Sequence, residues 1–235
     1  MNSLQREHSA EPYISKQCVR HTAKITKDES VEFSRAYEIT KRCFDVAAAS
    51  VMLVPAFPLM AVFMLLICLT SKGAPIYKHE RVGKNGKKIY LLKLRTMVQN
   101  ADNLMETLPE DLKREWHENF KLENDPRITK IGNFLRKTSL DELPQLLNVI
   151  KGDLSMVGPR PVVEEELKKY GANKDKFLSV TPGLTGYWQA YARSDCSYEQ
   201  RMRMELEYVD HANWIWDVKI LFRTVGIVLR CKGAK

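Results

Sequence analysis

Residues Val46 to Ser71 form a continuous run without a charged side chain. At 1.5 Å per residue, a helix of this length would cross the hydrocarbon core of a bilayer, which is about 30 Å thick. A single membrane-spanning helix is therefore the first interpretation. The rest of the chain then has to supply the water-exposed part of the protein.

Two features of the same region favour a helix that enters the membrane, breaks at Pro58 and returns. Pro55 and Pro58 lie near the middle of the run, where each removes a backbone hydrogen bond and bends the helix. Lys41 and Arg42 precede the run and Lys72 follows it, and the positive-inside rule places both ends in the cytoplasm. Since proline-kinked helices also span membranes, these residues leave both topologies open.

The chain is basic, with 37 Lys and Arg residues against 29 Asp and Glu and a net charge of +8 over 235 residues. Such a charge suits nucleic acid, an anionic membrane or a phosphate-rich substrate. The sequence has no long basic run and no helix-turn-helix or zinc-finger spacing, so nucleic acid is not expected as a partner. Five scattered cysteines without a CxxC pair indicate neither a disulfide framework nor a zinc site, and a reducing cytosolic setting is the simplest interpretation.

After the apolar run, two apolar-rich segments flank Lys84-Asn85-Gly86, and Asn-Gly in this position predicts a β-hairpin. Lys93 and Arg95 lie two residues apart in the second segment, on one face of the predicted strand. They are either a solvated strand face or a phosphate-binding pair. Helices are expected over 101–122 and 131–137, so the predicted fold is mainly α with a small β-hairpin.

Large apolar side chains between residues 214 and 227 are interleaved with Asp217, Lys219 and Arg223. Aromatic anchors and basic residues in one amphipathic segment are typical of a helix at the membrane interface. An ordinary amphipathic helix packed on the core has the same pattern. Both interpretations stay open from the sequence.

The segment Leu140–Pro161 reads LDELPQLLNVIKGDLSMVGPRP and contains the strongest functional pattern. Asp141 and Glu142 are adjacent acids at a predicted helix start, and Arg160 stands between Pro159 and Pro161. Asp can attack phosphorus or bind a metal ion, and Arg can form paired hydrogen bonds to phosphate oxygens. This pattern suits a site for phosphate and a divalent cation.

Helix capping offers a second explanation of the two acids. Ser139 with Glu142 three residues later has the pattern of a capping box. If the helix begins later, Asp141 becomes the N-cap and Pro144 falls in the first turn, where its missing N–H costs little. Capping is compatible with chemistry, since a helix N-terminus would help to keep Asp141 ionised beside an anionic substrate.

The order of these motifs resembles that of the bacterial sugar transferases, which are monotopic phosphoglycosyl transferases that load a sugar phosphate onto polyprenyl phosphate. The resemblance covers Tyr37 to the C-terminus and departs from the family pattern at Phe57 and at Tyr191-Ala192. The matching motifs are KRxFD at 41–45, ERxG at 80–83, DPR with TKIGxFLRKxSLDELPQL at 125–146, and PGxTGxxQ at 182–189.

The resemblance implies roles for individual residues. Asp141 would be the nucleophile, Glu142 would help to hold Mg²⁺ or manage a proton, and Arg160 would contact the nucleotide. The other residues implied in substrate binding are Arg81, Lys93, Arg95, Pro159, Pro161 and Arg193.

The resemblance also implies an organisation and an activity. The expected parts are a polar tail at 1–36, a re-entrant membrane helix at 37–72 and a catalytic domain at 73–235 with an interfacial C-terminal helix. The expected reaction transfers a sugar 1-phosphate from a UDP-sugar to undecaprenyl phosphate with Mg²⁺, through a covalent aspartyl intermediate, on the cytoplasmic face of a bacterial inner membrane. The alternatives are a non-catalytic membrane adaptor of glycan assembly and a spanning transferase without a covalent step. A homodimer is left open.

Overall fold

The computed structural model describes residues 33–105, 107–119, 122, 125–192 and 196–229. Nearly all of the predicted tail at 1–36 lies outside the described residues. The helices are α2 (Arg35–Thr70), α3 (Ala101–Met105), α4 (Glu110–Asn119), α5 (Lys130–Thr138), α6 (Gln145–Lys151), α7 (Glu164–Lys168), α8 (Lys174–Leu178), α9 (Tyr187–Tyr191), α10 (Tyr198–His211) and α11 (Trp214–Leu229). The strands are β1 (Ile76–Val82), β2 (Lys88–Leu94), β3 (Ser155–Val157) and β4 (Gly183–Thr185).

The prediction of a mainly helical fold with a small hairpin is confirmed. Strands β1 and β2 pair antiparallel around a turn in which Asn85 has a left-handed backbone, with φ of 55°. A second sheet, in which β3 and β4 run parallel, was not predicted. Each of its strands is only three residues long, which is too short for an alternating hydrophobic pattern to stand out.

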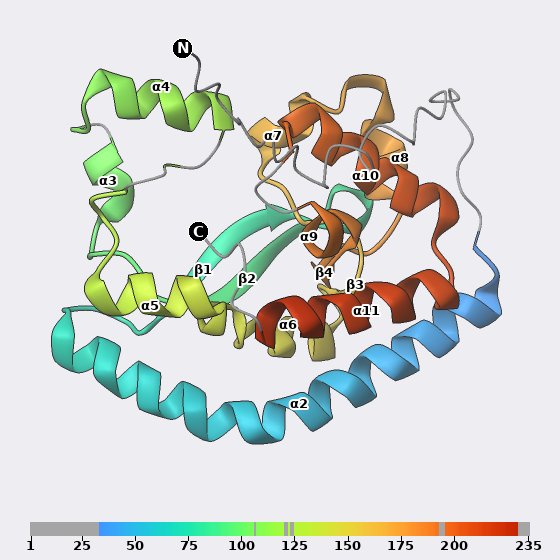
Figure 1. The fold of residues 1–235 in the computed structure, drawn as a ribbon, viewed down its shortest axis with the longest axis horizontal. Coiled ribbons are helices and arrows are strands. Elements are labelled where there is room, and N and C mark those ends of the chain that lie inside the picture. Colours follow the sequence, from blue (N-terminus) through green and yellow to red (C-terminus); the bar gives the residue numbers. More distant parts are fainter. Residues whose placement is uncertain (1–32, 106, 120–121, 123–124, 193–195, 230–235) are drawn as a thin grey trace, which may run out of the picture.

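The predicted interruption of the membrane helix is wrong. Helix α2 runs continuously from Arg35 to Thr70 and contains both Pro55 and Pro58. Figure 1 shows it as an arc beneath the rest of the molecule. The φ angle of proline is itself helical and each proline removes one N–H donor, so the neighbouring turns can continue while the helix bends.

Helix α2 packs lengthwise on the body of the protein. Ala49 and Ala56 belong to the largest hydrophobic core, while Ile67 packs with Leu94 and Leu135 in another core. The helix is long and apolar enough to cross a membrane, but only 17% of its most apolar window is buried. Its outward face carries exposed apolar residues: Val51, Met52, Val54, Phe57, Leu59, Val62, Leu65, Leu66 and Leu69.

Two arginines fasten the ends of α2 to the body. Arg42 donates to the carbonyls of Val149 and Ile150, at 2.6 and 2.7 Å, at the C-terminal end of α6. Arg95 on the hairpin donates to the carbonyls of Ser71 and Lys72, at 2.9 and 2.6 Å, just after α2 ends. Charged hydrogen bonds of this kind satisfy carbonyls that a helix terminus leaves unpaired.

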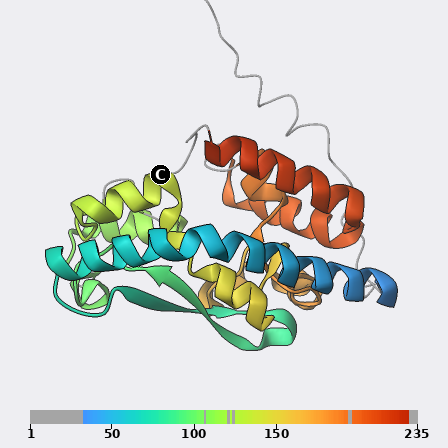
Figure 2. The same cartoon turned by 90° about the horizontal axis from the view of Figure 1, so that it is seen from below.

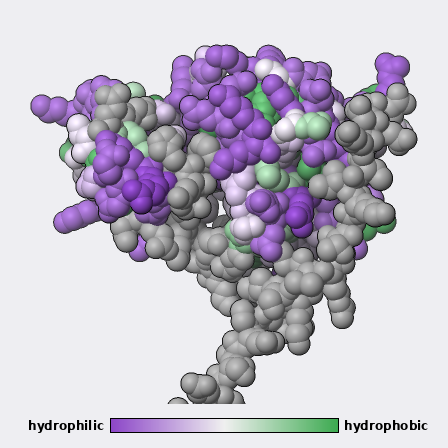
Figure 3. All heavy atoms as spheres, turned by 90° about the horizontal axis from the view of Figure 1, so that it is seen from above, coloured by the Kyte–Doolittle hydropathy of each residue, from purple (hydrophilic) through white to green (hydrophobic). Residues whose placement is uncertain are grey.

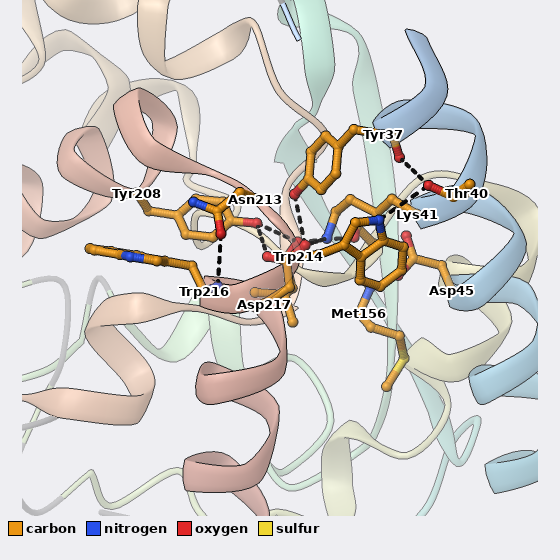
Figure 4. Close-up of polar contacts among 12 residues, drawn as sticks. Tyr37, Thr40, Lys41, Asp45, Met156, Tyr208, Asn213, Trp214, Trp216 and Asp217 are labelled. Atoms are coloured by element: carbon orange, nitrogen blue, oxygen red, sulfur yellow. Dashed lines mark hydrogen bonds and ion pairs between the residues drawn. The ribbon is translucent and has the colours of Figure 1, made fainter. Parts of the chain in front are cut away.

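A buried polar cluster joins the start of α2 to the C-terminal helices (Figure 4). The carboxylate of Asp217 in α11 is 1% exposed and lies 2.7 Å from the Lys41 ammonium. It also accepts hydrogen bonds from the hydroxyls of Tyr37 and Tyr208, both at 2.7 Å. Lys41, predicted as a flanking charge of the membrane segment, therefore joins α2 to α11.

Helix α11 buries one face and exposes an apolar one. Ile220 is 1% exposed and belongs to the main core. Figure 2 shows α2 crossing the front of the molecule from below with α11 beside it, whereas the opposite face in Figure 3 is largely hydrophilic. The exposed apolar side chains of α11 are Ile215, Val218, Phe222 and Val225.

Candidate active site

The two adjacent acids lie on a short 3-10 turn between α5 and α6. Ser139 has a left-handed backbone with φ of 59° and ends α5, and Leu140–Glu142 forms the turn. Helix α6 begins after Pro144, without a side-chain cap. Both capping predictions are therefore wrong, because the Ser139 side chain makes no capping hydrogen bond at the start of the 3-10 turn, and the N-cap position of α6 is Pro144 rather than Asp141.

Asp141 and Glu142 have different environments. Asp141 is 7% exposed, whereas the side chain of Glu142 is 42% exposed and its Oε1 lies 2.8 Å from Lys93 Nζ. Burial raises the pKa of Asp141, and the Glu142 charge adds to this while Lys93 opposes it. For Glu142, burial acts upward on the pKa, but the charge and hydrogen bond of Lys93 lower it overall. Glu142 is thus held ionised, and Asp141 is a poorly solvated carboxylate, as a nucleophile requires.

One face of the hairpin supplies positive charge to this turn. The register pairs Tyr77 with Lys93, so Tyr77, Arg81 and Lys93 share a face because strand residues alternate sides. Arg81 Nη1 lies 3.1 Å from Glu166 Oε1 in a buried ion pair. Burial lowers the pKa of Arg81 to about 10, so its guanidinium stays charged at neutral pH.

Arg160 follows β3 on a loop that is built by close backbone contact. The parallel pairing of β3 with β4 brings the Pro159–Pro161 segment beside the glycine-rich segment at 181–189. A Cβ on Gly183 would lie 2.1 Å from the Gly158 nitrogen, and one on Gly186 would lie 2.2 Å from the Gly158 carbonyl oxygen. These glycines therefore permit close contact between two backbones.

The guanidinium of Arg160 is available for an anion. Its backbone N–H donates to Glu205 Oε2 at 3.0 Å, and its guanidinium carbon lies 5.7 Å from the Trp188 ring centroid. Within the part of the chain that the structure describes, this guanidinium makes no ion pair. Burial lowers the pKa of Arg160, with the neighbouring Arg201 charge adding to the effect.

Sequence reasoning missed a buried charge network behind Arg160. Arg201 Nη2 lies 3.2 Å from Glu166 Oε2, and its guanidinium carbon lies 4.8 Å from the Trp188 ring centroid. Glu205 is fully buried, and burial raises its pKa to about 7. Arg201 and Glu205 are four residues apart on the buried face of α10. Charged residues at helical spacing within an apolar face could have indicated this network from the sequence.

Arg136 was also missed as a separate residue, although it lies within the motif that led to Asp141. It donates from Nε to the Thr96 hydroxyl at 2.9 Å. Burial lowers its pKa, and the charge of Asp141 acts in the opposite direction. Arg136 thus adds a cation from α5 whose charge lowers the pKa of Asp141.

The structure does not bring every predicted residue to this turn. Arg95 caps the end of α2 instead of facing the acids. Arg193 lies outside the described residues. The structure therefore places the charges of Lys93 and Arg160 near Glu142, whereas Arg81 pairs with Glu166.

The donor set of the turn suits Mg²⁺ bound together with substrate. No group of three or more His, Cys, Asp or Glu side chains within the described ranges could hold a metal ion. Magnesium, however, is commonly held by one or two carboxylates plus substrate phosphates and water. Asp141 and the partly exposed Glu142 provide those two carboxylates.

Comparison with known proteins identifies the family. The family model described as "Bacterial sugar transferase" matches residues 36–231. The chain belongs to the bacterial sugar transferase family. Membership accounts for the shared order of the motifs from the start of α2 to the end of α11.

The similar proteins include named transferases. The chain is 48% identical over 199 residues to the UDP-galactose-lipid carrier transferase of Erwinia amylovora, which covers 83% of the chain and 41% of that protein. It is 44% identical over 220 residues to the undecaprenyl-phosphate galactose phosphotransferase of Salmonella typhimurium, and this match covers 91% of the chain and 45% of that protein. It is 44% identical over 199 residues to the exopolysaccharide production protein ExoY of Rhizobium meliloti, and this match covers 83% of the chain and 88% of that protein. The chain thus spans less than half of the first two and most of the third.

Proposed function

We propose that the protein transfers a sugar 1-phosphate from a UDP-sugar to undecaprenyl phosphate. The observation that carries the proposal is the buried carboxylate of Asp141, next to a Glu142 carboxylate that pairs with Lys93 and is acted on by the Arg160 charge. A carboxylate surrounded by cations can attack phosphorus, because the cations neutralise the phosphoryl oxygens that would repel it. The choice of a UDP-hexose donor and of undecaprenyl phosphate as acceptor follows the names of the similar proteins.

In the first step, an oxygen of Asp141 attacks the phosphorus that carries the sugar. A bond between that oxygen and phosphorus forms while the bond from phosphorus to the bridging oxygen of the diphosphate breaks. The bridging oxygen leaves with the electron pair as part of UMP. Arg160 and Lys93 offset the negative charge that develops on the departing phosphate.

In the second step, a phosphate oxygen of undecaprenyl phosphate attacks the same phosphorus. The bond between phosphorus and Asp141 breaks, and the carboxylate recovers its electron pair. The product is a polyprenyl diphosphate sugar. Splitting the transfer into two displacements lets one carboxylate serve a water-soluble donor and a lipid acceptor in turn.

Asp141 and Glu142 would hold Mg²⁺ together with the diphosphate. When bound, the ion would neutralise phosphoryl charge and orient the phosphate for displacement. In this structure Lys93 Nζ lies 2.8 Å from Glu142 Oε1. Glu142 would exchange part of this contact for the ion when the donor binds.

We also propose that α2 is re-entrant and that the protein lies on the cytoplasmic face of a bacterial inner membrane. Both halves of α2 pack on one body, and both ends are fastened to it by arginines. A helix with both ends on the same body favours return to the same side of the bilayer. The exposed apolar faces of α2 and α11 would then contact lipid.

The test is release of UMP from UDP-galactose, UDP-glucose and other UDP-hexoses with Mg²⁺ and undecaprenyl phosphate. Release with one donor is expected from the wild type, and galactose is the first sugar to try because two similar proteins are named for it. Asp141→Asn should abolish release, while Asp175→Asn, at an exposed acid on α8, should not. A phosphosugar trapped on the protein in the absence of lipid would support the covalent route.

The alternatives give different results in the same experiment. A membrane adaptor would release no UMP from any donor, and Asp141→Asn would leave its lipid binding intact. A transferase without a covalent step would release UMP only when the lipid acceptor is present, and no phosphosugar would be trapped on the protein.

A further inference from the structure

His79 lies in the middle of the cationic face of the hairpin and belongs to none of the roles assigned above. The register pairs His79 with Leu91 and Tyr77 with Lys93. His79 therefore points to the same side as Lys93 and Arg81, because alternate strand residues share a face. Lys93 contacts Glu142, and Arg81 contacts Glu166.

The contacts of His79 define which ring nitrogen carries the proton. Its Nδ1 lies 3.4 Å from Arg81 Nη2. Since a guanidinium has donors only, Nδ1 accepts, and the proton of the neutral ring is on Nε2. The ring lies 5.6 Å from the ring of Tyr77, centroid to centroid. Among the residues whose placement is described, none accepts a hydrogen bond from Nε2.

The surrounding charges keep the ring neutral. Burial lowers the pKa of His79 to about 3, and positive charges on four other residues act in the same direction. Those four charges come from Arg81 on β1, Lys93 on β2, the Arg160 loop and Arg136 on α5. The nearby acids Glu142 and Glu166 are already paired with Lys93 and Arg81. At neutral pH, His79 offers an N–H donor without a further charge.

We infer that His79 donates its Nε2–H to a phosphate oxygen bound between Lys93 and Arg81. This inference rests on the proposed function and extends its binding site by one residue. A neutral donor here suits a phosphate group, because it adds a hydrogen bond where another cation would be repelled by four existing ones. The phosphate belongs either to the nucleotide donor or to the lipid acceptor.

Replacements that keep or remove one ring nitrogen test the inference. In His79→Gln the side-chain amide can place an N–H near the position of Nε2, whereas the shorter His79→Asn can replace only Nδ1. Gln is expected to retain kcat/KM within about threefold, and Asn and Phe to lose about 10- to 100-fold, the range for a hydrogen bond to a charged group. Glu80→Gln, on the opposite face of β1, is the matched control.

Binding measurements separate the two sources of phosphate and do not need turnover. Titration calorimetry with UDP, and separately with a short-chain polyprenyl phosphate in micelles, would be run on wild type, His79→Gln, His79→Asn and His79→Phe. Weaker binding of one ligand to His79→Phe, restored in His79→Gln, assigns the contact to that ligand. Thermal unfolding of each variant checks that the hairpin is still folded.

The outcomes distinguish this inference from the proposed function. Normal kcat/KM and normal binding of both ligands in folded His79→Asn and His79→Phe would overturn the role of His79 and leave the transferase intact. UDP binding that depends on His79, in a protein that transfers no sugar, would support the phosphate contact and refute the transferase. Equal losses in His79→Gln and His79→Phe would contradict a hydrogen bond from Nε2.

Discussion

The most informative residue is Asp141, because it is only 7% exposed and has no ion-pair partner among the residues that the structure describes. Its neighbour Glu142 is partly exposed to water and pairs with Lys93 at 2.8 Å. Two adjacent acids in one turn are therefore electrostatically unequal. This inequality is the reason that we propose Asp141, rather than Glu142, as the nucleophile.

The pH dependence of UMP release should reflect Asp141. Burial raises its pKa above the ordinary aspartate value of about 3.9. The nucleophile is the deprotonated form, so activity should fall as pH decreases through this raised pKa. Because the Lys93 charge opposes the rise, Lys93→Met should move the acid limb of the kcat/KM profile to higher pH. Lys87→Met, at an exposed position on the hairpin turn, should leave it in place.

Glu205 should affect stability in a pH-dependent way. Its folded-state pKa is raised by burial to about 7, so the folded protein binds this proton more tightly than the unfolded chain. This contribution to the unfolding free energy is present below about pH 4 and is lost as pH rises towards 7. Glu205→Gln has no carboxyl group to lose this proton, so its stability should not fall in this way. The melting temperature of Glu205→Gln minus that of the wild type should therefore increase from pH 5 to pH 8. A constant difference across this range would contradict the buried, protonated acid.

At the scale of elements, the site depends on how closely α5 approaches the hairpin. Gly132 in the first turn of α5 lies against Thr96, and a Cβ there would lie 1.9 Å from the Thr96 carbonyl oxygen. The N-cap Thr129 donates its backbone N–H to the same carbonyl at 3.0 Å. This contact fixes the position from which α5 delivers the turn with Asp141 and Glu142.

Gly132→Ala should therefore be strongly destabilising. The added methyl group meets backbone atoms, which cannot move aside as a flexible side chain can. We expect a loss of about 1–3 kcal/mol or more of unfolding free energy, the range for overpacking, together with lower transferase activity. The control is Gly226→Ala in α11, where a Cβ would meet nothing within 4 Å. That change should be neutral or stabilise by about 0.5–1 kcal/mol, and urea unfolding in detergent would measure both.

For the molecule as a whole, the exposed apolar faces of α2 and α11 and the polar contacts that hold α2 on the body would determine how the protein binds a membrane. Arg42, Arg95 and the Lys41–Asp217 pair fasten α2 along the body. The exposed apolar residues of α2 then form a surface of the body rather than a separate helix. Such an arrangement suits a protein that dips into one leaflet.

Cysteine labelling tests this topology. Arg35→Cys and Lys72→Cys, introduced singly into a chain with its natural cysteines replaced, place a thiol at each exposed end of α2. A membrane-impermeant reagent should label both from the same side as Asp175→Cys on the body. Labelling of the two ends from opposite sides would exclude the re-entrant helix, because the tethered ends would then have to separate across the bilayer.

Much of the fold was predictable from local chemistry. The uncharged run predicted an apolar helix, and Asn85-Gly86 predicted the hairpin. These features depend on backbone geometry and on side chains close together in the chain. The turn conformation at Ser139 was not predictable, since a capping pattern is also found where one helix ends and the chain reverses.

The apolar helix, the hairpin and the residue types available for phosphate chemistry could therefore be predicted from the sequence. Which charges meet depends on the tertiary fold. The fold places Arg95 at the end of α2, pairs Arg81 with Glu166 and places His79 among cations. The physical reason is that burial and partner distance set the properties of a charged group, and both depend on residues far away in the chain.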